Sequence, residues 1–295
     1  MQSLALFSFL LLLSACSRDT KTVGTDEIIE FTQPVKVEII GYTGNSMEPF
    51  ISRDGTTLLF NNLNSAPENT NLHWATKIND TTFQYKGEIA GVNTIDLEAV
   101  PSLDNNGNLY FVSTRNYTNT LSTLYQCNFY NGNATNVKLI NGISRLQAGW
   151  INFDVEVSAD GQMLYFTDSE FDQNGNPKTA DLVMAEKNGA DFKRLSNSDT
   201  ILKNINTDAL EYAACISTNQ LELYFTRLAL PVTAASLPEI LYCNRQSIND
   251  AFSSPAKINS ITGFAEAPTI APDQKTLYYH KKENNKFVLY LVRKK

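Results

Sequence analysis

Five carboxylate residues recur at similar places along the chain, and their side chains are the ones best suited to chemistry. Each stands just before a recurring short motif; they are Glu48, Glu98, Asp154, Glu211 and Glu266. If the motifs are equivalent, the five can gather at one mouth of a central channel. Such a ring could hold a cation or a polyol. Crowded carboxylates also raise one another's pKa, so the ring could supply the two acids that glycoside hydrolysis needs. The alternative is that each carboxylate accepts backbone hydrogen bonds and fastens one repeat to the next.

Other catalytic motifs are missing from the sequence. His73 and His280 are its only histidines, and no nucleophile motif lies near either one. No P-loop, dinucleotide fingerprint or zinc-protease motif occurs, and Asp172–Pro177 lacks the downstream glutamate of a calcium loop. We therefore assign no catalytic residue by motif and predict neither a cofactor nor a metal site.

Residues between the repeats form a second set of candidates, for contact with a ligand or a partner. Two long loops, Thr167–Ala180 and Thr226–Glu239, follow the second strands of their repeats, and the latter holds an apolar run. Exposed apolar, aromatic and arginine side chains are favoured where proteins bind partners. The side chains selected on this basis are Arg115, Tyr117, Phe171 and Arg227. Trp150, just upstream of Asp154, is a further candidate, as the aromatic ring that could stack on a sugar beside the carboxylates.

The elements that position all these residues are two strands joined by a turn, repeated five times. The first copy, residues 49–60, reads Pro-Phe-Ile-Ser-Arg-Asp-Gly-Thr-Thr-Leu-Leu-Phe. A third strand follows each hairpin, as at Leu72–Lys77, and a polar stretch leads to a fourth, as at Phe83–Ile89. Four strands in about 50 residues are typical of one β-propeller blade. The aromatic residues that close the copies are Phe60, Phe111, Phe166, Phe225 and Tyr279.

The fourth strand of the last copy is predicted at the other end of the chain. The fifth copy ends after its third strand, and Phe31–Val37 resembles Phe252–Ile258, the fourth strand of the fourth copy. We therefore predict an all-β fold, a five-bladed β-propeller of four-stranded blades over residues 30–295. Its last blade would be closed by the N-terminal strand. Six blades are the alternative, and they would require a blade that the repeat does not reveal.

The Pro-x-Ile-Ser-x-Asp-Gly-x-x-Leu-x-Phe line of these copies resembles the TolB-type, WD40-like propeller repeat of bacterial envelope proteins. The resemblance covers almost all of residues 30–295 and implies the propeller fold. It implies no single function, because this repeat occurs in binding proteins, accessory domains of enzymes and lipoproteins. TolB carries an extra N-terminal α/β domain for which this chain has no room, so TolB's partners are not carried over.

The first residues predict export and lipid attachment. Leu4–Leu13 is an apolar run too short to span a membrane, and it ends in Leu-Ser-Ala-Cys16, which resembles the bacterial lipobox. We expect residues 1–15 to be a lipoprotein signal peptide, Cys16 to carry the lipid and residues 16–29 to be a flexible tether. Ser17 after the cysteine favours, by family analogy, the outer membrane, with the protein facing the periplasm or the exterior.

Charge and cysteine content limit the partners further. The net charge is −7, which disfavours nucleic acid because its phosphates require basic surface. Cys127, Cys215 and Cys243 are expected as buried free thiols, since strand spacing keeps them too far apart for a disulfide. We predict a monomeric, lipid-anchored module that binds an envelope protein or a glycan without catalysis and touches the membrane only through its lipid. The alternative is a glycan-binding protein or glycoside-hydrolase-type enzyme that uses the carboxylates at the channel mouth.

Overall fold

The computed structural model describes residues 29–65 and 69–295, and strands dominate them. The helices of this part, α1 (Tyr117–Thr120) and α2 (Ser198–Ile201), are one turn each. Neither has the length and apolar character that a helix needs to cross a membrane. The predicted signal peptide, the lipid-bearing Cys16 and almost all of the predicted tether lie outside the described residues.

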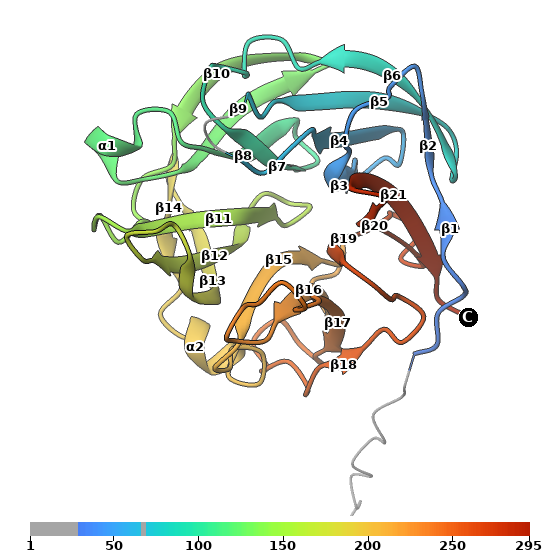
Figure 1. Cartoon of the computed structure of the whole chain (residues 1–295). Coiled ribbons are helices and arrows are strands. Elements are labelled where there is room, and N and C mark those ends of the chain that lie inside the picture. Colours follow the sequence, from blue (N-terminus) through green and yellow to red (C-terminus); the bar gives the residue numbers. More distant parts are fainter. Residues whose placement is uncertain (1–28, 66–68) are drawn as a thin grey trace, which may run out of the picture.

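The strands form mainly antiparallel sheets arranged around a common centre, which is the layout of a β-propeller (Figure 1). One sheet has the order β2-β6-β5-β4-β3, a second β10-β9-β8-β7, and a third β1-β21-β20-β19. The largest sheet runs from β11 to β18, but a single residue pair, Ala180 with Leu210, joins its two antiparallel halves. The bounds from β1 to β11 are β1 (Val35–Lys36), β2 (Glu38–Ile40), β3 (Met47–Ile51), β4 (Thr57–Asn61), β5 (Leu72–Asn79), β6 (Thr82–Glu88), β7 (Glu98–Leu103), β8 (Asn108–Ser113), β9 (Leu124–Tyr130), β10 (Asn133–Leu139) and β11 (Trp150–Val157). The remaining strands are β12 (Met163–Phe171), β13 (Pro177–Asn188), β14 (Asp191–Arg194), β15 (Leu210–Ile216), β16 (Glu222–Leu228), β17 (Glu239–Asn244), β18 (Ala256–Lys257), β19 (Ala265–Ile270), β20 (Thr276–Glu283) and β21 (Lys286–Arg293).

The serine of the repeat is explained by the turn that follows it. Ser52 Oγ donates to Asp54 and accepts the amide of Thr57, so one hydroxyl ties both sides of the turn together. Ser158 and Ser217 do the same in their own copies. The aromatic residues that close the copies are fully buried between neighbouring sheets, where they form part of the core.

A β-bulge interrupts each innermost strand, and it determines where the side chains of these strands point. The register shifts at the same place in β3, β7, β11, β15 and β19. The bulged residue has a positive φ, between 47° and 54°, which is uncommon for any residue but glycine. Bulges of this kind re-aim a side chain and are frequent beside active sites. The bulged residues are Glu48, Val100, Asp154, Ala213 and Ala267.

The N-terminal strand pairs with the C-terminal one. β1 lies antiparallel to β21, with Val35 opposite Leu291, in the way that β18 lies against β17. The resemblance between residues 31–37 and 252–258 therefore reflects the same outer-strand role at two places. The next residues form β2, which runs parallel to β6, so one extended segment contacts the first and the last sheet.

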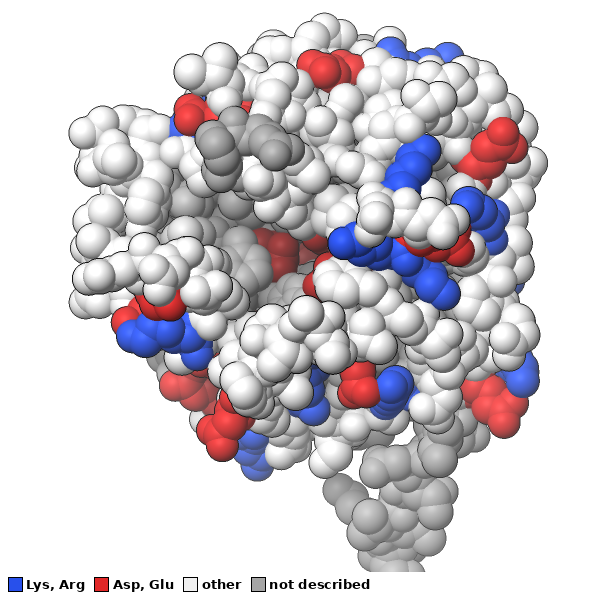
Figure 2. Space-filling view, viewed as in Figure 1, with Lys and Arg blue, Asp and Glu red and all other residues white. Residues whose placement is uncertain are grey.

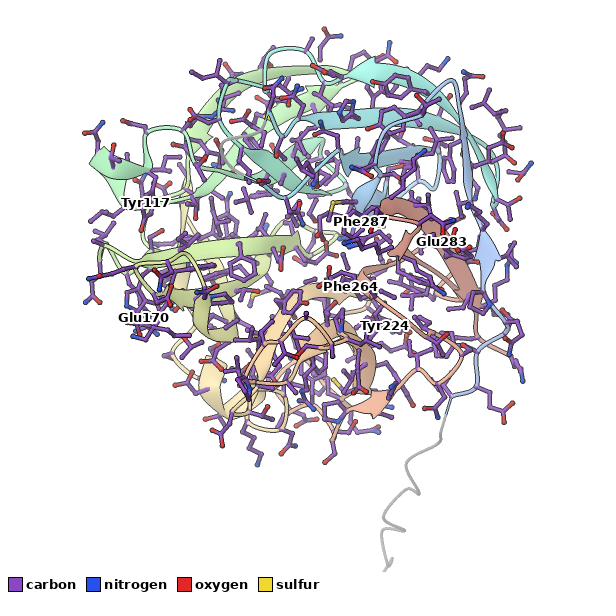
Figure 3. The ribbon with its side chains drawn as sticks, viewed as in Figure 1. Tyr117, Glu170, Tyr224, Phe264, Glu283 and Phe287 are labelled. Atoms are coloured by element: carbon purple, nitrogen blue, oxygen red, sulfur yellow. The ribbon has the colours of Figure 1, made fainter. Side chains whose placement is uncertain are left out.

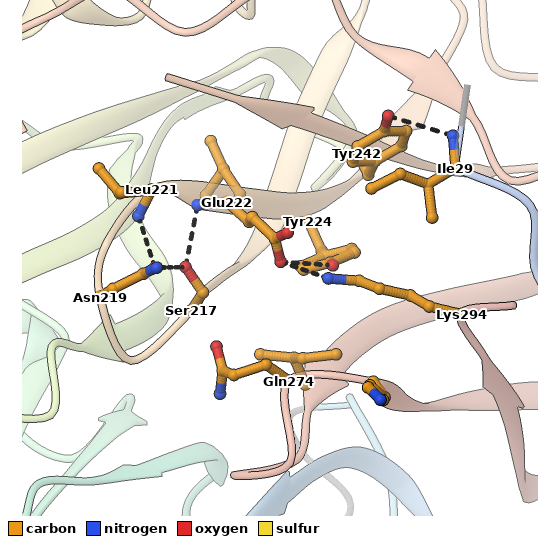
Figure 4. A network of polar contacts seen from close by, with 12 residues as sticks. Ile29, Ser217, Asn219, Leu221, Glu222, Tyr224, Tyr242, Gln274 and Lys294 are labelled. Carbon is orange, nitrogen blue, oxygen red and sulfur yellow. Dashed lines mark hydrogen bonds and ion pairs between the residues drawn. The ribbon is translucent and has the colours of Figure 1, made fainter. Parts of the chain in front are cut away.

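Polar contacts fasten both ends of this part of the chain to the neighbouring sheet (Figure 4). The amide of Ile29 donates to the hydroxyl of Tyr242 at 3.4 Å. Lys294, next to the C-terminus, forms an ion pair with Glu222, which also accepts a hydrogen bond from Tyr224. The three cysteines of the described residues are buried and free, which confirms the expectation from strand spacing.

Candidate active site

The bulges bring three of the five predicted carboxylates together at the centre of the fold. Glu48 and Asp154 occupy the bulges of β3 and β11, and Glu266 immediately precedes the bulge of β19. Glu48 and Asp154 are 7% and 6% exposed, and the Glu266 side chain is 13% exposed. Figure 2 shows a hollow in the middle of this face with acidic atoms on its floor. We call Glu48, Asp154 and Glu266 the central carboxylates.

His280 connects two of the central carboxylates. Its Nδ1 accepts a hydrogen bond from the Glu48 amide at 3.2 Å, and its Nε2 lies 3.2 Å from Glu266 Oε2. Since Nδ1 can accept only when it carries no proton, the neutral ring has its proton on Nε2 and donates it to Glu266. The ring is fully buried and packs edge-on against Phe287, which lies near the centre in Figure 3.

Strand β15 contributes no carboxylate to the cluster but positions two of them. Tyr212 donates its hydroxyl proton to Glu266 Oε1. The amide of the next residue, Ala213, donates to Asp154 Oδ2 at 3.0 Å. Adjacent residues of one bulge therefore hold the acids of β11 and β19 on either side of β15.

Burial raises the pKa of Glu48 to about 8 and that of Asp154 to about 7. For Glu48, His280 and a 2.7 Å hydrogen bond from Asn64 act in the opposite direction, whereas the charges of Asp154 and Glu266 raise the pKa further. For Asp154, the amide of Ala213 lowers the pKa and the charge of Glu266 raises it. Glu48 Oε2 has no hydrogen-bond partner among the described residues. Glu48 is thus a neutral carboxylic acid near pH 7, the protonation state that a general acid requires.

The other two predicted carboxylates do not join this cluster, so the expected ring of five is wrong. Glu98 and Glu211 lie two residues before the bulges of β7 and β15 and are fully buried. Glu98 pairs with Arg115 at 2.9 Å, and Glu211 with Arg227 at 2.6 Å. Each also accepts the amide and the hydroxyl of a threonine four residues earlier. The offset of two residues from the bulge places these carboxylates beside Arg115 and Arg227, outside the cluster of central carboxylates.

The selected arginines belong to these ion pairs and not to an open contact surface. The Arg115 guanidinium lies over the rings of Phe111 and Tyr125, at 5.5 and 5.3 Å from their centroids. Arg227 lies over Phe225 at 5.6 Å. Each arginine therefore neutralises a buried acid and covers an aromatic ring of its own sheet.

The selected aromatic residues lie away from the central carboxylates. The Tyr117 hydroxyl donates to the carbonyl of Trp150, whose indole ring lies under the guanidinium of Arg145 at 4.2 Å. Figure 3 places Tyr117 at the edge of the molecule. Phe171 is half-buried against Phe153, with ring centroids 6.3 Å apart, and is not an exposed loop residue.

Two residues of the site, His280 and Tyr212, were not selected from the sequence. His280 was set aside because no nucleophile lies near it in the chain, yet it stands directly opposite Glu266 in the β19–β20 ladder. The turn serine gives a usable signal, because counting back four residues from Ser52 and Ser158 reaches Glu48 and Asp154. The same count from Ser217 reaches Ala213, which shows that the five carboxylates are not equivalent.

No family model and no curated protein matches this sequence. Solved structures do resemble it in fold. A structure named as a BT0996 RGII complex has a TM-score of 0.60 at 10% identity and covers 90% of this chain and 93% of its own. The α-L-arabinofuranosidase PaAbf62A from Podospora anserina, in complex with cellotriose, has a TM-score of 0.53 at 14% identity and covers 90% of this chain and 96% of its own. Zg3597 from Zobellia galactanivorans, a family 117 glycoside hydrolase, has a TM-score of 0.52 at 9% identity, and the match covers 90% of each chain.

These likenesses and the sheet topology define the chain as a β-propeller protein. Structures of TolB are also among its neighbours, such as TolB from Acinetobacter baumannii, with a TM-score of 0.44 at 14% identity over 85% of this chain and 54% of that one. The prediction of a non-catalytic binding or assembly module is contradicted, because the structures with the higher scores are named as glycoside hydrolases. They support the alternative prediction better, although at such identities likeness shows the fold alone.

Proposed function

We propose that this protein is a glycan-active hydrolase whose catalytic groups are Glu48 and Glu266, with Asp154 beside them. The observation that carries the proposal is the convergence of these three acids from β3, β11 and β19 at the centre of the fold, with Glu48 held neutral near pH 7. Glycosidic bond cleavage needs one protonated and one ionised carboxyl group beside the bond. The names of the similar structures, which include complexes with cellotriose and xylotriose, support the same class of substrate.

The contacts suggest a distinct role for each acid. Glu48 transfers its proton to the glycosidic oxygen as the bond from that oxygen to the anomeric carbon breaks. Glu266, held by Tyr212 and His280, is the carboxylate that acts as base toward water or as nucleophile toward the anomeric carbon. Asp154 raises the pKa of Glu48 through its charge and so keeps the acid protonated.

Variants of the central carboxylates test this function. Glu48→Gln and Glu266→Gln should each lower the release of reducing ends from arabinose- or xylose-containing glycans by about 10²- to 10⁴-fold, the usual contribution of general acid–base catalysis. Asp154→Asn should lower it less near pH 7, because Asp154 acts only through the pKa of Glu48. Glu170→Gln is the matched control, because Glu170 lies at the edge of the molecule in Figure 3 and pairs with Lys178. Folded variants of Glu48 or Glu266 that hydrolyse the same glycan as fast as the parent would contradict the proposal.

We propose further that the sheets correspond to five blades. The eight-stranded sheet counts as two blades because a single residue pair joins its halves, and each blade then contributes one bulged inner strand. The last blade is β19, β20 and β21 completed by β1, as the N-terminal resemblance predicted.

We also propose that the protein is anchored in the cell envelope through a lipid on Cys16, with the propeller held off the membrane by residues 17–29. The lipobox-like sequence supports this location, where glycans are available as substrates. Labelling with a fatty-acid analogue should mark the parent protein and spare Cys16→Ala, which should be released from the membrane fraction. Equal labelling of both would place the attachment elsewhere.

A further inference from the structure

A second groove lies between the first two inner hairpins, on the face away from the central carboxylates. It has a volume of about 580 Å³ and is lined by the β3–β4 and β7–β8 turns, β5 and the β9–β10 hairpin. Strand β3 ends at Ile51 and the turn after it carries Arg53 to this groove, so Glu48 and the groove lie at opposite ends of the strand. We call it the Trp74 groove, after the residue at its side, and it is separate from the proposed active site.

Three aromatic residues form one side of the Trp74 groove: Trp74, Phe129 and Tyr130. The Trp74 and Phe129 rings meet edge to face, with centroids 6.4 Å apart. A side chain at Gly132 would clash with the indole ring, since a Cβ there would be 2.4 Å from it, so glycine lets the ring lie on the hairpin backbone. Tyr130 is 84% exposed at the tip of this hairpin.

The opposite side of the groove consists of two rigid polar turns. The Asp104 carboxylate accepts the amides of Asn106 and Asn108, both at 2.8 Å, and the Asp54 carboxylate accepts the amide of Thr56 at 3.0 Å. These bonds fix the turn backbones. Asn105 and Thr56, which also line the groove, are exposed.

Aromatic side chains opposite amide and hydroxyl groups suit a ligand that is apolar on one face and rich in hydroxyls at its edge. A sugar ring has this character, whereas an anion would meet Asp54 and Asp104, and a purely apolar ligand would leave the turns unpaired. We infer that the Trp74 groove is a second saccharide-binding site. It would hold a glycan chain on the protein without cleaving it, and it goes beyond the proposed hydrolysis because it uses none of the central carboxylates.

The two tryptophans of the chain make the test specific. Trp150→Phe leaves Trp74 as the only tryptophan, so its fluorescence reports on this groove. Titration with xylotriose and cellotriose should give a saturable change, and Tyr130→Ala should weaken the binding at least tenfold. Ile95→Ala, at a 90% exposed residue outside the groove, is the control and should bind as the parent does.

Glu266→Gln separates this site from the proposed active site. Binding reported by Trp74 should persist in that variant whether or not the protein hydrolyses glycans. A flat fluorescence titration, or binding lost in Glu266→Gln and kept in Tyr130→Ala, would overturn the second site. Asn105→Ala, in an exposed turn residue, repeats the test without altering an aromatic ring and should also weaken binding.

Discussion

At the scale of single residues, Glu48 combines features that rarely occur together. It has a positive φ of 47°, it is 7% exposed, and one of its carboxyl oxygens has no partner in the described part of the chain. Strained backbone and an unsatisfied polar atom both cost free energy, and such costs are concentrated at functional sites. Burial, together with the charges of Asp154 and Glu266, explains why its acid form persists to about pH 8.

The raised pKa of Glu48 predicts how stability depends on pH. When folded, Glu48 keeps its proton up to about pH 8, whereas in the unfolded chain it ionises near its ordinary value of 4.5. The native state therefore binds the extra proton between these values, and the stability from this group falls as pH rises through that window. Glu48→Gln has no proton to lose, so its melting temperature relative to the parent should rise steadily from pH 5 to pH 8. Thermal melts of both proteins, with Glu170→Gln as control, check this; a constant difference would contradict it.

Residue identity alone could not sort the five carboxylates. All precede the repeat by a few positions, but a difference of one or two residues relative to the bulge decides whether a carboxylate joins the central cluster or a buried ion pair. His280 and Tyr212 could not be found either, because their importance depends on contacts across the ladder and between sheets. The free cysteines were predictable because strand spacing alone decides them.

At the scale of elements, the Glu98–Arg115 and Glu211–Arg227 pairs are the same buried ion pair formed in two sheets. Each joins the start of an inner strand to an arginine at or just beyond the end of the second strand, and each acid is fully buried. The repeated strands and turns were predictable from their serine, glycine and aromatic residues. The bulge was not, since its residues range from valine to glutamate and share no side-chain chemistry.

Removal of one arginine should therefore destabilise the fold strongly. Arg115→Ala leaves the Glu98 charge buried without its partner, which costs about 3–5 kcal/mol of unfolding free energy. Lys193→Ala breaks an exposed pair with Glu186 and should cost no more than about 1 kcal/mol. Urea unfolding measures both. Similar small losses for the two variants would show that the buried pair is unimportant, whereas Arg115→Ala together with Glu98→Gln should recover part of the loss.

At the scale of the whole molecule, the segment at residues 30–41 joins the first and the last sheet. It supplies β1 to β21 and β2 to β6, and its loss would expose the edges of both partner strands. Open edges promote aggregation. The pairing was predictable because Phe31–Val37 resembles the outer strand of another copy, and the place where the inner strands converge also followed from the repeat.

Deletion of residues 30–41 should therefore lower the melting temperature sharply or cause aggregation, as measured by scanning fluorimetry and light scattering. Deletion of residues 17–28, which lie before the first described strand, is the control and should leave melting unchanged. An N-terminally shortened protein that lacks residues 30–41 and still melts as the parent does would contradict the role of this segment in holding the two sheets.

The pH dependence of glycan hydrolysis tests the central claim, acid catalysis by Glu48 within the three-carboxylate cluster, most directly. The rate constant kcat/KM should fall above about pH 8, as Glu48 loses its proton. Since the charge of Asp154 raises the pKa of Glu48, the residual activity of Asp154→Asn should fall at a lower pH than that of the parent. Glu170→Gln should keep the parental profile. A basic limb that stays in place in Asp154→Asn, or a rate that does not decline above pH 8, would contradict this assignment.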